Sequence, residues 1–141
     1  MIYLAEKYIL KNIFLVTALL ICGYSYSQNA ALSFCTYVNN ASQECVFENT
    51  KFITTPDSTH AKLYMFFRMR LPFGTNRLTY KIYSIDRFGK EVFSREVYQD
   101  VQTEWLVAWQ PETFVSPGKY MIHVFRGAEE ITSNGFEFYN N

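Results

Sequence analysis

The sequence predicts an all-β protein in which residues 28–141 form a single antiparallel sandwich of two sheets and seven or eight strands, after a cleaved signal peptide at residues 1–27. Three observations predict this fold. Beyond the leader, apolar and polar residues alternate and no 3.6-residue helical period is found. Tyr, Phe, Val, Ile and Thr gather in short runs, as they do in strands. Gly, Pro and Asn separate these runs at intervals typical of sandwiches, about 8 to 12 residues.

The N-terminal segment has the layout of a secretory signal peptide. Lys7 and Lys11 precede the apolar run 13–22, which is too short to span a bilayer as a helix. A small-x-small tripeptide at 25–27 follows, so cleavage is expected before Gln28. We therefore expect an exported chain, secreted or periplasmic, with no transmembrane helix after cleavage.

A lipid anchor on Cys22 is the alternative, because Gly23 follows this cysteine at the end of the apolar run. Ile21, however, stands where the lipoprotein-processing peptidase requires a small residue. The unanchored form is therefore our prediction.

Two cysteines remain after cleavage, and they flank the turn-forming stretch 39–42. The flanking segments can fold back as a hairpin and bring Cys35 and Cys45 together. In an oxidising compartment we expect these two residues to form a disulfide.

The first strands are expected on either side of this turn, in "SFCTYV" and "ECVFENTKFI". Next comes "AKLYMFFRMRL", whose two alternating sets are expected to face opposite ways because one of them ends in two arginines. The core set is Leu63, Met65, Phe67 and Met69, and the outward set is Tyr64, Phe66, Arg68 and Arg70. The segment 72–74 breaks this strand before "RLTYKIYSI", whose inner row is Leu78, Tyr80 and Ile82.

The remaining strands follow in the same way. A glycine-containing turn at 86–90 joins the preceding strand to "EVFSREVYQ" as a hairpin. "TEWLVAW" is expected to be a strand with Trp105, Val107 and Trp109 on one face, and Pro111 is expected to end it because proline offers no N–H. The last hairpin joins "GKYMIHVF" to "ITSNGFEFY", and its inner row is Tyr120, Ile122, Val124, Phe136 and Phe138.

The C-terminal part carries a motif, "F-x-x-P-G-K-Y-x-I-x-V" at Phe114 to Val124, with an F-x-F ending. It resembles the final strands of immunoglobulin-like and fibronectin-III-like sandwiches. With the "D-x-x-G-K-x-V" hairpin at 86–92, it is also similar to macroglobulin-type sandwich domains of secreted proteins. The resemblance covers roughly residues 60–139 and implies a tyrosine corner at Tyr120, whose hydroxyl reaches back to the backbone. It brings no catalytic residue with it.

The net charge and the motifs of the sequence limit the classes of function that we expect. Removal of the leader takes Lys7, Lys11 and Glu6 from 13 basic and 13 acidic side chains, so the net charge becomes −1 and favours no nucleic-acid partner. His60 and His123 are the two histidines, and no H-E-x-x-H, G-x-S-x-G, P-loop or C-x-x-C motif occurs. We expect no enzyme, no catalytic residue, no metal and no cofactor.

Aromatic residues make up 18% of the chain, and they are the feature that suggests binding. An outward face rimmed by arginines suits a protein partner in the cell envelope or outside the cell, because aromatic residues and Arg are enriched at interfaces. The predicted face is Tyr64, Phe66, Arg68, Arg70, Tyr83 and Phe125. The alternative is a small carbohydrate-binding module in which Trp105 and Trp109, about 13 Å apart on one face of a strand, stack on a glycan.

Overall fold

The computed structural model describes residues 30–54 and 60–140, and these residues contain strands and no helix. The all-β prediction is confirmed. The predicted signal peptide and the Cys22 alternative lie outside the described residues. The strands are β1 (Ala30–Cys35), β2 (Tyr37–Asn39), β3 (Glu44–Val46), β4 (Lys51–Thr54), β5 (Ala61–Met69), β6 (Arg77–Ile85), β7 (Glu91–Asp100), β8 (Val107–Phe114), β9 (Gly118–Arg126) and β10 (Glu129–Asn140).

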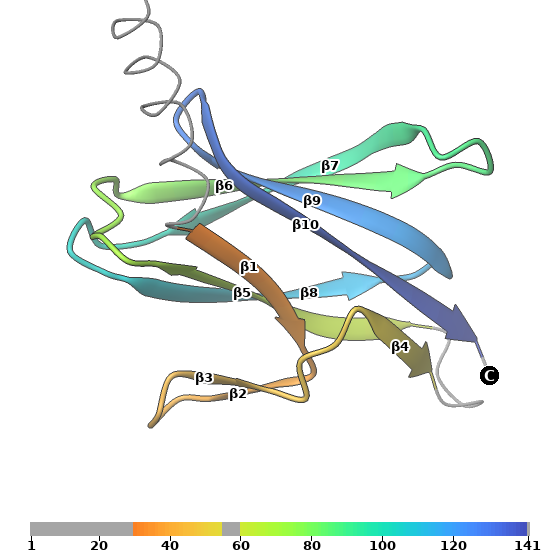
Figure 1. The fold of residues 1–141 in the computed structure, drawn as a ribbon, viewed down its shortest axis with the longest axis horizontal. Helices are drawn as coiled ribbons and strands as arrows, with labels where there is room; N and C mark the ends of the chain where they lie inside the picture. Colours follow the sequence, from red (N-terminus) through yellow and green to blue (C-terminus); the bar gives the residue numbers. More distant parts are fainter. Residues whose placement is uncertain (1–29, 55–59, 141) are drawn as a thin grey trace, which may run out of the picture.

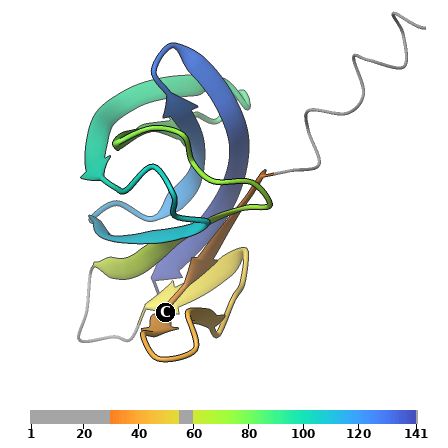
Figure 2. The ribbon, with the colours of Figure 1, turned by 90° about the vertical axis from the view of Figure 1, so that its left-hand side faces the viewer.

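Eight of these strands form the predicted sandwich (Figure 1). A three-stranded sheet has the order β1-β5-β8, and a five-stranded sheet has the order β4-β10-β9-β6-β7. Neighbouring strands run antiparallel, except that the short edge strand β4 runs parallel to β10. The other two strands, β2 and β3, pair with each other as a hairpin. This hairpin forms a third layer on the side of the three-stranded sheet that faces away from the five-stranded sheet (Figures 1 and 2).

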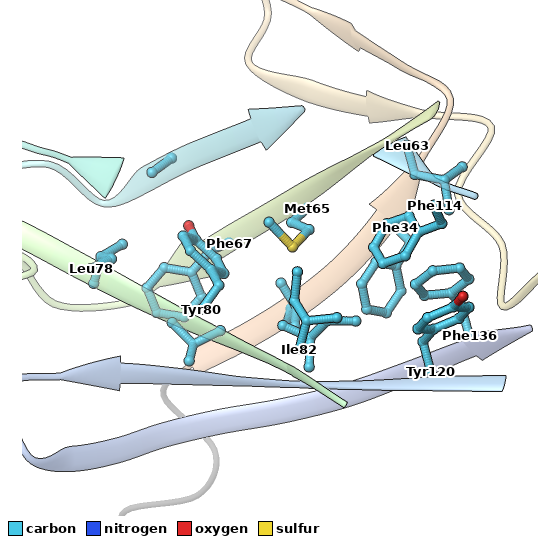
Figure 3. Packing of buried hydrophobic residues seen from close by; sticks show 14 of the residues in the cluster. Phe34, Leu63, Met65, Phe67, Leu78, Tyr80, Ile82, Phe114, Tyr120 and Phe136 are labelled. Atoms are coloured by element: carbon cyan, nitrogen blue, oxygen red, sulfur yellow. The ribbon is translucent and has the colours of Figure 1, made fainter. Parts of the chain in front are cut away.

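The core lies between the two large sheets (Figure 3). The predicted inner rows are buried, apart from Met69, which is half-buried at the end of β5. Aromatic rings fill one end of this core, where Phe136 packs against Phe34, Phe114 and Tyr120 with ring centroids 4.7 to 5.4 Å apart. These separations are those of favourable aromatic pairs.

The predicted turns form as expected. The tyrosine corner is present, because the Tyr120 hydroxyl donates to the Ser116 carbonyl at 2.6 Å while its ring is buried. In the β6–β7 turn, one carboxylate oxygen of Asp86 accepts the backbone N–H groups of Phe88 and Lys90. Gly89 adopts a φ of 79° there, which glycine reaches without strain.

The prediction for Pro111 was wrong. β8 begins at Val107, two residues after Trp105, and continues through Pro111 to Phe114. A proline is tolerated because β8 is an edge strand. The carbonyls of Trp109 and Thr113, two residues to either side of Pro111, accept bonds from β7 side chains, and residues two apart in an antiparallel ladder face the same edge. The backbone nitrogen of Pro111, which carries no hydrogen, therefore faces the free edge of β8. The ladder between β8 and β5 loses no hydrogen bond.

Polar side chains close the gaps between the two sheets. On one side, Gln99 of β7 donates to the Trp109 carbonyl of β8 at 2.9 Å, and Arg95 pairs with Glu112 at 2.9 Å. On the other side, Asn134 of β10 donates to the Leu32 carbonyl of β1 at 2.8 Å. These bonds also cover edge carbonyls that could otherwise pair with another chain.

Candidate functional site

The outer face of the three-stranded sheet is covered in part by the β2–β3 hairpin (residues 37–46). Val38 and Cys35 are buried together with Phe66, which is only 5% exposed although it points away from the main core. Cys45, Tyr64, Val107 and Trp109 pack around them. The sandwich therefore has a second, smaller core beneath the hairpin.

The predicted disulfide between Cys35 and Cys45 is confirmed, with Cα atoms 5.7 Å apart and a sequence separation of ten. It joins the end of β1 to β3, and so it ties the hairpin to the sheet below. It does not cross the main core between the two large sheets.

The structure does not bring the six residues of the predicted binding face together. Tyr64, Phe66 and Arg68 lie on β5 of the three-stranded sheet, and Arg70 follows just after this strand. Tyr83 and Phe125 lie on β6 and β9 in the five-stranded sheet. The outer faces of the two sheets point to opposite sides of the sandwich, which separates the two groups (Figure 1).

Tyr83 and Phe125, the two residues of the predicted binding face on the five-stranded sheet, each contact neighbouring side chains. The Tyr83 ring meets the Phe93 and His123 rings edge to face, at centroid distances of 5.6 and 5.1 Å. The Lys81 ammonium lies 4.4 Å from the centroid of the Phe125 ring, which is a cation–π contact. His123 also contacts the carboxylates of Glu91 and Glu130.

The two tryptophans differ in their settings. Trp109 is half-buried on the outer face of β8, where its ring stacks on Phe66 with centroids 6.2 Å apart and an interplanar angle of 11°. Trp105 precedes β8 and is 40% exposed. The two tryptophans were predicted to lie on one face of the same strand. That prediction was wrong, because Trp105 lies before the start of β8.

Both tryptophans nevertheless line one cavity of about 500 Å³, which we call the Trp cavity. This volume lies within the usual range for ligand pockets. The lining residues are Gln43, Gln99, Asp100, Trp105, Leu106, Val107, Ala108 and Trp109. The cavity thus combines the loop before β8, the end of β7 and the turn of the hairpin.

Exposed apolar side chains lie in the loop that lines the Trp cavity and in the loop paired with it. Leu106 is 44% exposed, and Leu71 in the adjoining loop is 62% exposed. Backbone bonds hold the two loops side by side, from Phe73 N–H to the Trp105 carbonyl at 2.9 Å and from Met69 N–H to the Leu106 carbonyl at 2.8 Å. Sequence reasoning did not identify Leu71 as a neighbour of Trp105 and Leu106, because only the pairing of the two loops brings these segments side by side.

Arginines stand beside this apolar surface. Arg68 pairs with Val107 across the β5–β8 ladder, its guanidinium carbon lies 5.5 Å from the Phe66 ring centroid, and it reaches the Gln43 carbonyl at 3.5 Å. Arg70 is exposed just beyond β5. Among the described residues, neither arginine has a carboxylate within salt-bridge distance, whereas the lining residue Asp100 is paired with Arg77 at 3.0 Å.

Gln99 connects the Trp cavity to the main core. Its amide oxygen accepts the Tyr80 hydroxyl at 2.7 Å while its amide nitrogen bonds the Trp109 carbonyl. Burial raises the pKa of the Tyr80 hydroxyl well above its ordinary value, because a phenolate would be desolvated there. Tyr80 therefore stays a neutral donor to Gln99.

A second cavity of about 650 Å³ lies on the opposite flank of the hairpin. Its lining residues are Ala31, Ser33, Glu44, Cys45, Val46, Phe47, Glu48, Phe66 and Arg68. Phe47 at its edge is strongly exposed and has a φ of 57°, an unfavourable backbone conformation for a residue other than glycine. Phe66, which is buried beneath the hairpin, and the exposed Arg68 therefore both line this second cavity.

Within residues 30–54 and 60–140, no group of three or more His, Cys, Asp or Glu side chains is arranged to hold a metal ion. In the same ranges, no helix has the length and apolar character needed to cross a membrane.

No family model and no curated protein matches the chain. Among solved structures, it is similar to an immunoglobulin-like protein from Pseudomonas aeruginosa, with a TM-score of 0.50, 15% identity, and coverage of 80% of this chain and 98% of that one. An alkylpurine DNA glycosylase from Pseudomonas fluorescens, bound to DNA containing an abasic site analogue, gives a TM-score of 0.34 at 14% identity. This match covers 61% of this chain and 27% of that one, and it is too weak to show a shared fold. The strand arrangement and the first of these neighbours together show that the chain has an immunoglobulin-like β-sandwich fold.

Proposed function

We propose that the chain is an exported, non-enzymatic binding module of the cell envelope that binds a protein partner at the Trp cavity and its rim. The observation that carries this proposal is that the exposed side chains of Trp105 and Leu106 line a cavity beside Arg68, with the exposed Leu71 in the loop paired to their own. Exposed apolar patches of this kind mark interaction sites, and their mixture of aromatic residues and Arg is typical of protein interfaces.

The Trp cavity has the features of a pocket for an anchoring side chain. Interface energy concentrates where a large side chain fills a desolvated pocket. Trp109 forms a fixed wall because it stacks on Phe66, while Trp105 and Leu106 remain open to contact. The partner is therefore expected to place an apolar side chain in the cavity and polar groups at the arginines.

Export and the lack of enzymatic activity belong to the same proposal. A disulfide is rare in reducing compartments, so the Cys35–Cys45 bridge supports a secreted or periplasmic location. The sequence lacks the common catalytic motifs, and the described residues that line the Trp cavity include no histidine, serine or cysteine nucleophile.

Paired double variants test the site. Trp105→Ala/Leu106→Ala removes the rim, and Val92→Ala/Phe93→Ala removes an equally exposed aliphatic and aromatic pair from the five-stranded sheet. We expect the first variant to bind the partner isolated with the wild type at least about tenfold more weakly, and the second to bind it normally. Equal affinity of the first variant and the wild type would rule out this site.

Carbohydrate binding is the second candidate, because both tryptophans line the same cavity together with the polar side chains of Gln43 and Asp100. Aromatic rings beside amide and carboxylate groups suit a sugar ring. Retention of the wild type on immobilised envelope polysaccharide, and its loss in Trp105→Ala, would favour this function. Trp105 is the residue to change, because Trp109 also supports the small core beneath the hairpin.

A further inference from the structure

Among the described residues, the β2–β3 hairpin is held to the molecule by its disulfide, by the packing of Val38 in the small core on Phe66, and by few hydrogen bonds. Among the described strands, ladder bonds join β2 to β3 and to no strand of the two large sheets. Outside the ladder, Arg68 reaches the Gln43 carbonyl at a long 3.5 Å, and just after the hairpin Asn49 N–H donates to the Phe34 carbonyl at 3.1 Å. A two-stranded hairpin of this size is at best marginally stable alone.

The face beneath the hairpin has the same character as the rim of the Trp cavity. Tyr64, Phe66 and Trp109 present aromatic surface there, and Arg68 stands beside them. The hairpin turn at Gln43 lines the Trp cavity, and β3 lines the cavity on the other flank. Displacement of the hairpin would therefore join the two cavities into one continuous aromatic surface.

The main core does not depend on the hairpin. No residue from 36 to 46 belongs to the buried cluster between the two large sheets, which is built from β1, β4 to β10 and the adjoining loops. Opening of the hairpin would leave that cluster intact. The hairpin is thus a local unit that can open while the sandwich stays folded.

We propose that the hairpin is a lid over part of the binding surface and that the Cys35–Cys45 disulfide is its redox-sensitive latch. Reduction of the disulfide opens the lid and extends the surface at the Trp cavity. This regulation rests on the proposed binding function, although the opening itself requires no partner. Loop-closure entropy for so short a ring shifts the opening equilibrium by about 100-fold.

A dithiol reductant supplies the electrons for this step. Cys35 is fully buried while Cys45 is partly exposed, so the reductant thiolate attacks the sulfur of Cys45 and Cys35 leaves as a thiolate that takes up a proton. The second thiol of the reductant then attacks the reductant sulfur that is bonded to Cys45 in the mixed disulfide. This step releases Cys45 as a thiolate, which also takes up a proton. The protein gains two electrons and two protons, and the dithiol becomes a disulfide.

Hydrogen exchange with and without dithiothreitol tests the lid directly. On reduction, amides in residues 37–46 should exchange up to about 100-fold faster, while those of β6 and β9 keep their protection. The variant Cys35→Ser/Cys45→Ser should show the open pattern without reductant and no further change with it. Unchanged protection of the hairpin, or loss of protection in β6 and β9 as well, would overturn the proposal.

Binding of the partner, measured with oxidised and reduced wild type, tests the regulatory step separately. Reduction should raise the partner's affinity by at least about tenfold, and the double serine variant should bind as the reduced protein does. A lid that opens with no change in affinity would overturn the regulation. Equal binding by the rim variant Trp105→Ala/Leu106→Ala would instead overturn the proposed site, so the two failures are distinguishable.

Discussion

Replacement of Gln99 by alanine tests how the two sheets are joined beside the Trp cavity. Gln99 accepts the hydroxyl of Tyr80, which is fully buried, and donates to the Trp109 carbonyl. Its loss leaves the Tyr80 hydroxyl without an acceptor inside the core, which costs about 1–3 kcal/mol, whereas the Trp109 carbonyl at an edge can bond water. We therefore expect Gln99→Ala to lower the free energy of unfolding by about 2 kcal/mol.

Denaturant unfolding of the variants Gln99→Ala, Tyr80→Phe and the double variant measures this contribution. Tyr80→Phe removes the hydroxyl that Gln99→Ala would leave without an acceptor. In a protein that already carries Tyr80→Phe, Gln99→Ala should therefore lower the free energy of unfolding only slightly. The coupling free energy should be about 1–2 kcal/mol. Free energies that add within about 0.5 kcal/mol, or a single Gln99→Ala cost below that value, would refute the reasoning.

The same hydroxyl predicts a pH dependence. Burial raises the pKa of Tyr80, so the native state keeps this proton at pH values where the unfolded chain, with an ordinary tyrosine pKa of about 10, releases it. Its contribution to stability is complete below about pH 10 and is lost as pH rises toward the native pKa. Above pH 10 the wild type should therefore lose stability faster than Tyr80→Phe, by up to about 1.4 kcal/mol per pH unit. Parallel pH profiles would contradict this.

Three further changes have defined outcomes in thermal or denaturant unfolding. A Cβ at Gly135 would stand 2.7 Å from the Tyr120 carbonyl oxygen, so Gly135→Ala should cost about 1–3 kcal/mol, and an unchanged midpoint would contradict the packing of β9 on β10. Tyr120→Phe removes the bond to Ser116 and should cost about 1 kcal/mol. Cys35→Ala/Cys45→Ala should lower the free energy of unfolding by less than the ~2.8 kcal/mol expected from loop closure. The reason is that the hairpin, once free to open, gains chain entropy in the folded protein as well as in the unfolded chain. A loss of the full ~2.8 kcal/mol would contradict the lid.

The inner rows and turns could be predicted from the sequence because their signals are local. Alternation of apolar residues fixed Leu78, Tyr80 and Ile82 as an inner row, and the Pro-Gly turn before Tyr120 indicated the corner. The ten-residue separation and the turn formers between Cys35 and Cys45 were likewise sufficient for the disulfide.

The candidate site could not be predicted in the same way, because it depends on which strands share a sheet. The alternation in β5 and β6 shows that Phe66 and Tyr83 point outward, but only the topology reveals that they face opposite sides. Pro111 ends a strand in general, and its acceptance here depends on the edge position of β8. Leu71 ends the alternating run "AKLYMFFRMRL" in the sequence, but β5 ends at Met69 and the loop that contains Leu71 pairs with the loop of Trp105.

Site-specific photo-crosslinking in the native envelope tests the central claim most directly. A photoreactive residue in place of Leu106 reports on the rim of the Trp cavity, and one in place of Phe93 reports on the equally exposed outer face of the five-stranded sheet. Our account predicts a discrete protein adduct from position 106 and none from position 93. An adduct from position 93 alone, or no adduct from position 106 in either redox state, would contradict it.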